Sequence, residues 1–304
     1  MSDPRNRRSA ALVAAAVALA AGVPARTMAE SSGESHAAAE PSDLGLSNFF
    51  ARGWNEPWVE RHSATPDMAL LRVEPAFLYT QFRVDFVRSV FRNDPVFSGS
   101  TQAKASLSYA LNRRIQLTVS GTYVWDTIPG QPSPNGAGAS IYALVQLVDN
   151  PFMAYAFQAE VETPNQGIGE AQTALVFSLA GWQDVARWIP ALGPVGLYYS
   201  LKWETLTGPS EPGEARNGLT WDVSVARTWT PSSTPVFGNL TTFLEATMSM
   251  PLGGDDAGKV TFSLTPGLRF SILEEHAILL GVDLPVSHDP PYSATWRATY
   301  LLEL

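Results

Sequence analysis

The sequence contains no cysteine and only four histidines among its 304 residues. The lack of cysteine excludes disulfides, thiolate metal sites, cysteine nucleophiles and an N-terminal lipid anchor. Beyond the N-terminal region no stretch reaches about 18 consecutive apolar residues, so the rest of the chain offers no candidate transmembrane helix. Charged residues make up 16% of the chain and apolar residues 45%, which fits neither a disordered protein nor a helical membrane protein.

The charged residues that are present are mainly acidic, and the formal net charge is −9. Residues 1–29 hold four of the 20 basic residues and one of the 29 acidic residues. Without them, 16 basic residues face 28 acidic ones, a net charge of −12. Nucleic acid is therefore not an expected partner.

The first 29 residues have the pattern of a secretory signal peptide. Arg5, Arg7 and Arg8 form a basic leader, residues 10–23 form an apolar run, and residues 27–29 form a small-residue cleavage site. The other interpretation, a membrane anchor, is disfavoured because the apolar run is short for a span. We predict a cleaved signal peptide over 1–29, an N-terminal periplasmic segment over 30–67 and a β-barrel over 68–304.

From residue 68 onward, segments of about ten residues alternate between apolar and polar side chains. Ile115, Leu117 and Val119 point to one side of a predicted strand, while Gln116 and Thr118 point to the other. This alternation is typical of transmembrane strands, which have one lipid-facing side and one polar side. A soluble β-sandwich also alternates, so the loops must decide between the two.

The predicted connections alternate between short and long. Asn112-Arg113 and Asn150-Pro151 are tight turns, whereas 126–138, 206–217 and 286–292 are long and rich in proline, glycine and charge. Outer-membrane barrels have short periplasmic turns, long outer loops and an even number of strands. We therefore predict an all-β fold, an antiparallel up-and-down barrel of about twelve strands in the outer membrane of a Gram-negative bacterium. Its strands are expected near 68–88, 101–111, 114–125, 139–149, 152–163, 171–182, 194–205, 218–229, 239–251, 259–272, 277–285 and 293–304.

Some segments depart from this scheme. The turns 183–193 and 230–238 are long where short ones are expected, and the first of them has room for a short periplasmic helix. In the first predicted strand the apolar parity changes near Thr80. Either a β-bulge causes the change, or only one half of the segment belongs to the wall.

Aromatic residues at outward positions sort by depth in this scheme, as the two interfaces of a membrane favour. Those near the predicted outer ends are Trp125, Trp203 and Trp221, and those near the periplasmic ends are Tyr109, Tyr155, Trp229 and Tyr300.

The inward positions carry charges of both signs, with acids in excess. Such a lining can select solutes by charge, with acidic residues favouring cations. Alternatively, the charges form ion pairs that fill a narrow bore. Arg72, Glu74 and Gln158 are also predicted to face inward. The predicted selectivity candidates are Arg83, Asp85, Lys104, Glu160, Glu162, Lys202, Glu204, Asp222, Glu245, Arg269, Asp283 and Arg297.

Residues 41–67 precede the predicted wall and contain Phe49, Phe50, Trp54 and Trp58 among polar residues. One interpretation is a periplasmic plug or partner-docking element. The favoured one is an interfacial collar packed on the barrel rim. Residues 30–40 have the composition of a disordered leader.

Two stretches of this region, Asn48-Phe49-Phe50 to Gly53-Trp54-Asn55-Glu56-Pro57-Trp58 and Thr65-Pro66-Asp67-Met68-Ala69-Leu70-Leu71-Arg72-Val73, carry a family resemblance. They resemble the opening of bacterial outer-membrane transporter-like proteins similar to the phenol-degradation MetA-like family. The resemblance covers about 25 residues. It implies outer-membrane transport, with hydrophobic or aromatic compounds as candidate solutes, and it supplies no ligand residues.

Enzyme chemistry has little support. His288 stands beside Ser287 in a predicted loop with Asp289, but adjacent side chains on a strand point apart and form no nucleophile–base pair. The inward pairs Glu160–Glu162 and Lys202–Glu204 are candidates for acid–base chemistry, although paired lumen charges more often have a structural role. No metal-ligand spacing or phosphate loop is present, and residues 253–256 are too short a cluster for a calcium loop. We therefore expect no cofactor and no metal.

The sequence thus predicts a non-enzymatic, porin-like outer-membrane channel or transporter that passes small solutes, either hydrophobic or aromatic compounds or cations. A closed structural or adhesion barrel with functional outer loops is the alternative, and an outer-membrane hydrolase has the least support. The expected partners are outer-membrane lipid, an unidentified small solute and the barrel-assembly machinery during insertion.

Overall fold

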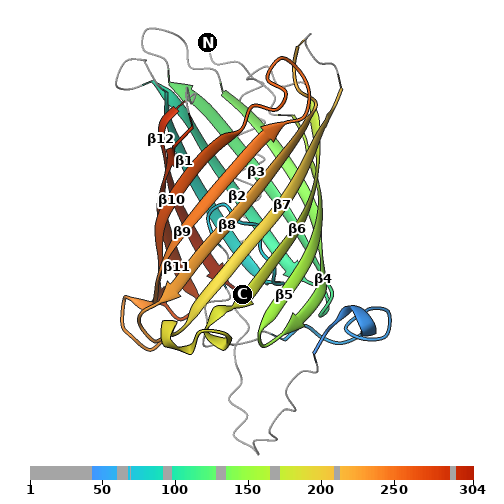
Figure 1. Ribbon diagram of the computed structural model, residues 1–304, viewed down its shortest axis with the longest axis vertical. Coiled ribbons are helices and arrows are strands. Elements are labelled where there is room, and N and C mark those ends of the chain that lie inside the picture. The colour runs from blue at the N-terminus through green and yellow to red at the C-terminus, as the bar shows by residue number, and fades with distance from the viewer. Residues whose placement is uncertain are drawn as a thin grey trace, which may run out of the picture.

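The computed structural model describes residues 43–59, 68, 70–91, 98–127, 135–164, 172–208, 213–287 and 292–304. These residues form twelve antiparallel strands that close into a barrel in sequence order, with β1 paired to β12 (Figure 1). The predicted signal peptide and leader, and His288 and Asp289, lie outside the described residues. The strands are β1 (Gln81–Phe91), β2 (Gly99–Ala110), β3 (Ile115–Thr127), β4 (Asn135–Asn150), β5 (Met153–Glu162), β6 (Thr173–Asp184), β7 (Val195–Thr207), β8 (Asn217–Thr228), β9 (Gly238–Pro251), β10 (Thr261–Leu273), β11 (His276–Pro285) and β12 (Tyr292–Glu303).

The wall follows the predicted alternation. In β3 the polar Gln116 and Thr118 are buried on the inner side, whereas Leu117 and Val119 are exposed on the outer side. An exposed apolar exterior is stable in lipid, and closure satisfies the backbone groups that an open sheet edge would leave unpaired. The wall therefore has the exterior of a transmembrane barrel.

Tight turns gather at one end of the barrel, as predicted. Asn112 Oδ1 accepts hydrogen bonds from the backbone N–H groups of Arg114 and Ile115. In the β4–β5 turn, Asn150 Oδ1 accepts hydrogen bonds from the backbone N–H groups of Phe152 and Met153. These side-chain turns explain how so few residues reverse the chain. Because short turns are periplasmic in outer-membrane barrels, this end is the periplasmic end.

The long β6–β7 connection holds two 3-10 turns, η2 (Val185–Arg187) and η3 (Pro190–Leu192), where a short helix was expected. Asp184 accepts a hydrogen bond from the backbone N–H of Ala186 and caps η2. Within the described part of the chain no helix has the length and hydropathy needed to cross a bilayer.

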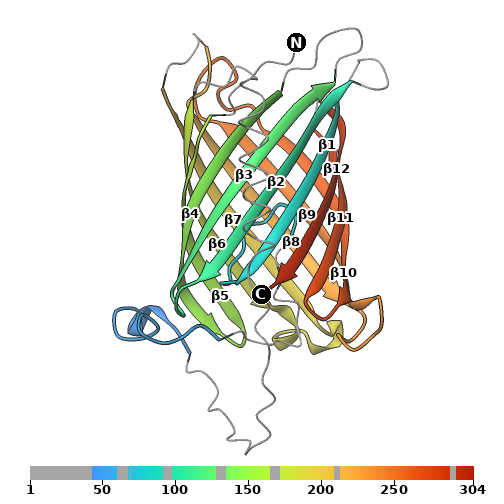
Figure 2. The ribbon, with the colours of Figure 1, turned by 180° about the vertical axis from the view of Figure 1, so that it is seen from behind.

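The predicted first strand over 68–88 is half wrong. The wall begins at Gln81, and residues 70–80 are not a strand. Figures 1 and 2, which view the barrel from opposite sides, both show this inner segment (residues 70–80, cyan) inside the barrel. The parity change at Thr80 therefore marks the point where the chain leaves the lumen and joins the wall, and not a β-bulge.

Residues 43–59 form a collar outside the wall at the periplasmic end, beside the ends of β3, β4 and β5 (Figures 1 and 2). It contains the 3-10 turn η1 (Leu46–Asn48), and Leu44 pairs with Asp149 of β4 through two backbone hydrogen bonds of 2.9 Å. The collar thus extends the sheet by one isolated bridge.

Candidate functional site

The periplasmic half of the lumen is filled by an apolar layer between the inner segment and the wall. Leu70, Leu71 and Val73 of the inner segment are buried, and the ring of Phe77 packs edge-on against that of Trp182 with 5.1 Å between centroids. The described residues of this layer are packed like a protein core. The wall residues of the layer are Ala154, Ala180, Trp182, Tyr198, Ala226, Phe243, Ala277, Leu279 and Leu301.

Two neighbouring glycines shape the wall where the inner segment approaches it. Gly267 of β10 and Gly281 of β11 are register partners. A Cβ at position 281 would lie 2.5 Å from Leu71 Cδ1, and one at position 267 would lie 2.3 Å from the Phe243 ring. The absence of side chains at these two positions therefore makes the space for Leu71 and Phe243.

Next to the apolar layer, a network of ion pairs joins the inner segment to the wall. Arg72 Nη1 lies 2.8 Å from Asp283 Oδ2, and Arg297 Nε lies 2.8 Å from the same oxygen. Asp283 is almost fully buried and also accepts a hydrogen bond from Thr265 at 2.7 Å. Each charge in this network has a partner of opposite sign, which offsets the cost of removing the charge from water.

Further polar contacts fix the backbone of the inner segment. Glu245 of β9 accepts hydrogen bonds from the N–H groups of Arg72 and Val73 at 3.1 and 3.3 Å. Glu74 forms an ion pair of 2.7 Å with Lys202 of β7. The Gln146 side chain donates to the carbonyl of Ala76 at 2.8 Å. Three strands on different sides of the barrel thus hold the inner segment in place.

A cavity of about 400 Å³ lies beside the inner segment. Among the described residues that line it, five side chains are acidic and five are basic, so the cavity is polar and nearly neutral overall. Residues 70–75 form one of its sides, and inward residues of β1, β2, β4, β5, β6, β7 and β12 form the rest. The charged lining consists of Arg72, Glu74, Arg83, Asp85, Lys104, Glu160, Glu162, Lys202, Glu204 and Arg297.

Ion pairs occupy much of this lining. Arg83 contacts both carboxylate oxygens of Asp85 at 2.8 and 2.9 Å. Lys104 lies 3.7 Å from Glu160 and 3.8 Å from Glu162. Lys104 thus faces two carboxylates, and Glu204 adds another carboxylate to the lining.

The structure places all twelve predicted selectivity candidates on the inner face. Eight of them line the cavity. Asp222, Glu245 and Asp283 are instead buried in hydrogen bonds to wall or inner-segment groups, and Arg269 lies 3.4 Å from Glu303 near the periplasmic end. Lys202 pairs with Glu74 of the inner segment.

Arg72 and Glu74 have the inward contacts expected of them but belong to the inner segment rather than to a wall strand. Sequence reasoning missed this segment because Leu71, Arg72, Val73 and Glu74 imitate strand alternation. A signal was present in the large apolar side chains at inward positions of the wall, such as Trp182 and Phe243, which require an apolar partner inside the lumen.

The four aromatic residues proposed for a plug or collar lie at the periplasmic rim. Phe50 is almost fully exposed, and Phe49 packs between Phe50 and Trp54 with ring centroids 5.1 and 5.3 Å apart. Trp58 packs against Leu78 and its inward neighbours at the mouth of the lumen. Residues 43–59 thus lie at the rim, where the collar interpretation places them, and residues 70–80 lie in the lumen; the roles of plug and collar stay predictions.

The collar is folded around Arg114, whose side chain is completely buried. Its guanidinium donates five hydrogen bonds, including those to the carbonyls of Arg52 and Leu147 at 2.9 Å. Gly53 has a φ of +87°, and a Cβ there would lie 2.8 Å from Arg114 Cγ, so only glycine fits this position without strain. Arg114 therefore joins the collar to the ends of β3 and β4.

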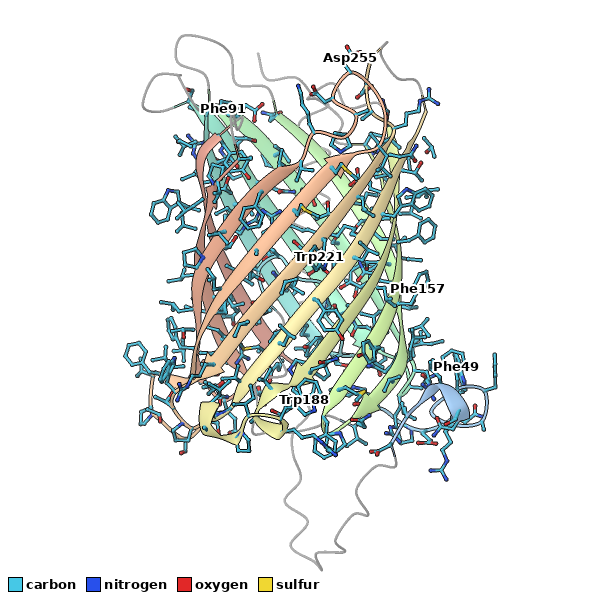
Figure 3. All side chains as sticks on the ribbon, viewed as in Figure 1. Phe49, Phe91, Phe157, Trp188, Trp221 and Asp255 are labelled. Carbon is cyan, nitrogen blue, oxygen red and sulfur yellow. The ribbon has the colours of Figure 1, made fainter. Side chains whose placement is uncertain are left out.

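The seven predicted belt aromatics face outward. Tyr109, Trp203, Trp221 and Trp229 are exposed, and Trp125, Tyr155 and Tyr300 are half-buried. Trp221 was expected near the outer ends, but Figure 3 shows it on the wall between the two rims. It is the fifth residue of a tilted strand and so lies some way below the outer end of β8.

The lipid-facing exterior, the closed antiparallel wall and the polar lumen define the class of the protein, a transmembrane β-barrel of the outer-membrane type. The chain is similar to the NanC porin, with 9% identity, a TM-score of 0.52 and coverage of 73% of this chain and 100% of the porin. It is also similar to an outer membrane channel from Pseudomonas putida F1, with 11% identity, a TM-score of 0.55 and coverage of 81% and 100%. Neither a protein-family model nor a curated protein sequence matches the chain. At these identities the likenesses show the fold.

Proposed function

We propose that the protein is a channel of the Gram-negative outer membrane that passes small solutes through its lumen, and that the inner segment controls the opening. The observation that carries this proposal is the combination of a charged cavity of about 400 Å³ with a separate, non-strand segment that closes the lumen beside it. A purely structural barrel needs no segment of this kind, because wall side chains alone can fill a narrow bore.

Opposing free-energy terms act on the docking of the inner segment in the lumen. Burial of a large apolar side chain contributes about 1.5–3 kcal/mol. Ordering one backbone residue costs about 1–2 kcal/mol. These terms oppose each other for residues 70–80, and the polar contacts of Arg72, Glu74 and Glu245 add to the docking of the segment. A segment in this balance is suited to gating.

Glu162 and Glu204 are two carboxylates of the cavity lining, and carboxylates at a pore lining favour cations among the solutes. The local resemblance of residues 48–73 to the MetA-like family instead points to hydrophobic or aromatic compounds, and membership of that family stays a prediction. The proposal therefore commits to passage through the lumen with a preference for cations among charged solutes.

The test is the single-channel conductance of the refolded protein in planar bilayers, with reversal potentials under a salt gradient. Glu162→Gln with Glu204→Gln should lower the cation preference, because the double variant removes two negative charges from the cavity lining. Asp256→Asn, in the exposed β9–β10 loop, is the matched control and should leave the preference unchanged. Glu160 is a poorer target because it also holds Ser140 at 2.6 Å and Gln158 at 3.2 Å.

The apolar layer in the periplasmic half of the lumen is the observation that favours the second candidate, a closed structural or adhesion barrel. The two are separated by a variant that frees the inner segment. If folded barrels with Asp283→Asn and with Gly281→Val both show no conductance steps in the bilayer, the channel proposal is wrong and the closed barrel is the better account.

A further inference from the structure

The collar has an exposed apolar surface that the channel proposal does not use. Leu46 is 68% exposed and Phe50 is 93% exposed. Phe49 and Trp54 complete the same cluster through edge-to-face ring contacts. We call Leu46, Phe49, Phe50 and Trp54 the aromatic foot.

The aromatic foot lies beside the wall and not beneath the lumen. Figures 1 and 2 show the collar projecting sideways beyond the wall at the level of the lower strand ends, and in Figure 3 Phe49 lies outside the wall at its lower end. Solutes leaving the lumen therefore do not meet this surface.

The foot is continuous with the lipid-facing exterior. The collar is hydrogen-bonded to the β2–β3 turn through Asn112, which donates to the carbonyl of Trp54 at 2.9 Å. Tyr109 and Leu111, at the periplasmic end of β2 and in the same turn, are exposed apolar residues of the lower wall. The exposed surface of the barrel thus passes from the wall onto the collar through this turn.

The foot is held in a fixed place. Arg114 donates to the carbonyls of Gly45 and Arg52 and to the Asn48 side chain, on both sides of the aromatic residues, and it also binds the end of β4. Its guanidinium lies 4.9 Å from the Phe49 ring centroid. A buried arginine with these contacts fixes the height of Phe50 relative to the wall.

We propose that the aromatic foot inserts into the periplasmic leaflet, at the boundary between phospholipid headgroups and acyl chains. Aromatic and apolar side chains on a short, otherwise polar segment are the chemistry that this boundary favours. The foot then acts as a lipid contact that fixes the collar, and through Arg114 the periplasmic mouth, at one depth. This inference rests on the membrane location in the proposed function.

The test uses the natural absence of cysteine, which allows single labelled sites. Phe50→Cys and Leu46→Cys, each carrying a nitroxide spin label, are measured in the refolded protein in vesicles of phosphatidylethanolamine and phosphatidylglycerol. Power saturation compares accessibility to oxygen, which concentrates in lipid, with that to a water-soluble nickel chelate. Val119→Cys, on the outer face of β3, is the lipid control, and Glu275→Cys, in the exposed β10–β11 turn, is the aqueous control.

We expect the labels at 46 and 50 to be more accessible to oxygen than to nickel, with values between those of the two controls. Nickel accessibility equal to that at Glu275 overturns the inference, and so does dipolar broadening that disappears on dilution with unlabelled protein, which would identify a second copy as the occupant. An aqueous label at Val119 would instead contradict the membrane location itself. The failures of the two proposals are therefore distinguishable.

Discussion

Arg72 and Asp283 form an ion pair of 2.8 Å although 211 residues separate them in the chain. Arg72 belongs to a segment inside the lumen, and Asp283 belongs to the wall strand β11. Asp283 also binds Arg297 of β12, so one carboxylate balances two guanidinium groups. This residue is therefore the point at which the inner segment depends most on the wall.

Asp283→Asn should free the inner segment. Breaking a buried ion pair by removing one partner costs about 3–5 kcal/mol. We expect more of the time in a conducting state and a larger mean conductance in planar bilayers than for the unaltered protein. Asp255→Asn, in an exposed loop, is the control. Unchanged conductance in a barrel of normal heat stability would show that Asp283 does not hold the segment.

Gly281→Val should have a similar effect through steric exclusion and without changing charge. The added Cβ would lie 2.5 Å from Leu71 Cδ1, so Leu71 must leave its place. Gly218→Val is the matched control, because a Cβ at this strand glycine meets no atom within 4 Å. Single-channel recording compares the two variants. Equal conductance in both would contradict the role given to Gly281, which is to leave space for Leu71.

Much of the wall follows from the sequence because lipid and water impose period two on every strand. Eleven of the twelve predicted strands match observed ones, and the alternation of tight and long connections gave the orientation. The exception is the segment before Gln81. Its residues Leu71 to Glu74 alternate as those of a wall strand do, and its long-range contacts to Asp283 and Glu245 are invisible in local sequence.

The collar was expected from its aromatic residues, but its anchor was not. Arg113 and Arg114 are adjacent at the β2–β3 turn, and both are buried. Arg114 is completely buried because the collar supplies carbonyl oxygens for it, and these acceptors come from backbone groups that no residue pattern reveals. Side-chain identity alone therefore could not separate the roles of the two arginines.

Arg114→Ala should detach the collar from the wall. A hydrogen bond from a charged donor contributes about 1.5–3 kcal/mol. We therefore expect proteolysis within residues 43–59 of the folded barrel to become at least about tenfold faster. Arg52→Ala, whose side chain is exposed, should change this rate little. Equal cleavage of the unaltered protein and the Arg114 variant would refute the anchor.

Docking of the collar should also weaken in acid. Hydrogen bonds from the Arg113 side chain and from the Gly53 backbone hold the pKa of Glu56 below its ordinary value of 4.5. The contribution of the Glu56 carboxylate to docking of the collar is therefore complete above pH 4.5. It is lost as the pH falls through the lowered pKa of Glu56. Glu56 is partly exposed, so the effect is about 1 kcal/mol or less. Protease protection of the collar should fall in this range for the unaltered protein and stay level for Glu56→Gln.

The most direct test of the central claim, that the inner segment opens and closes the lumen, is single-channel recording from a barrel in which the segment can be tethered reversibly. Leu71→Cys and Gly281→Cys put thiols on two contacting positions, since a Cβ at 281 would lie 2.5 Å from Leu71 Cδ1. Asp283→Asn weakens the natural anchor. In the triple variant, oxidation should close the channel and a reductant should restore conductance within the same recording. The same conductance before and after reduction, with the disulfide verified, would contradict the claim.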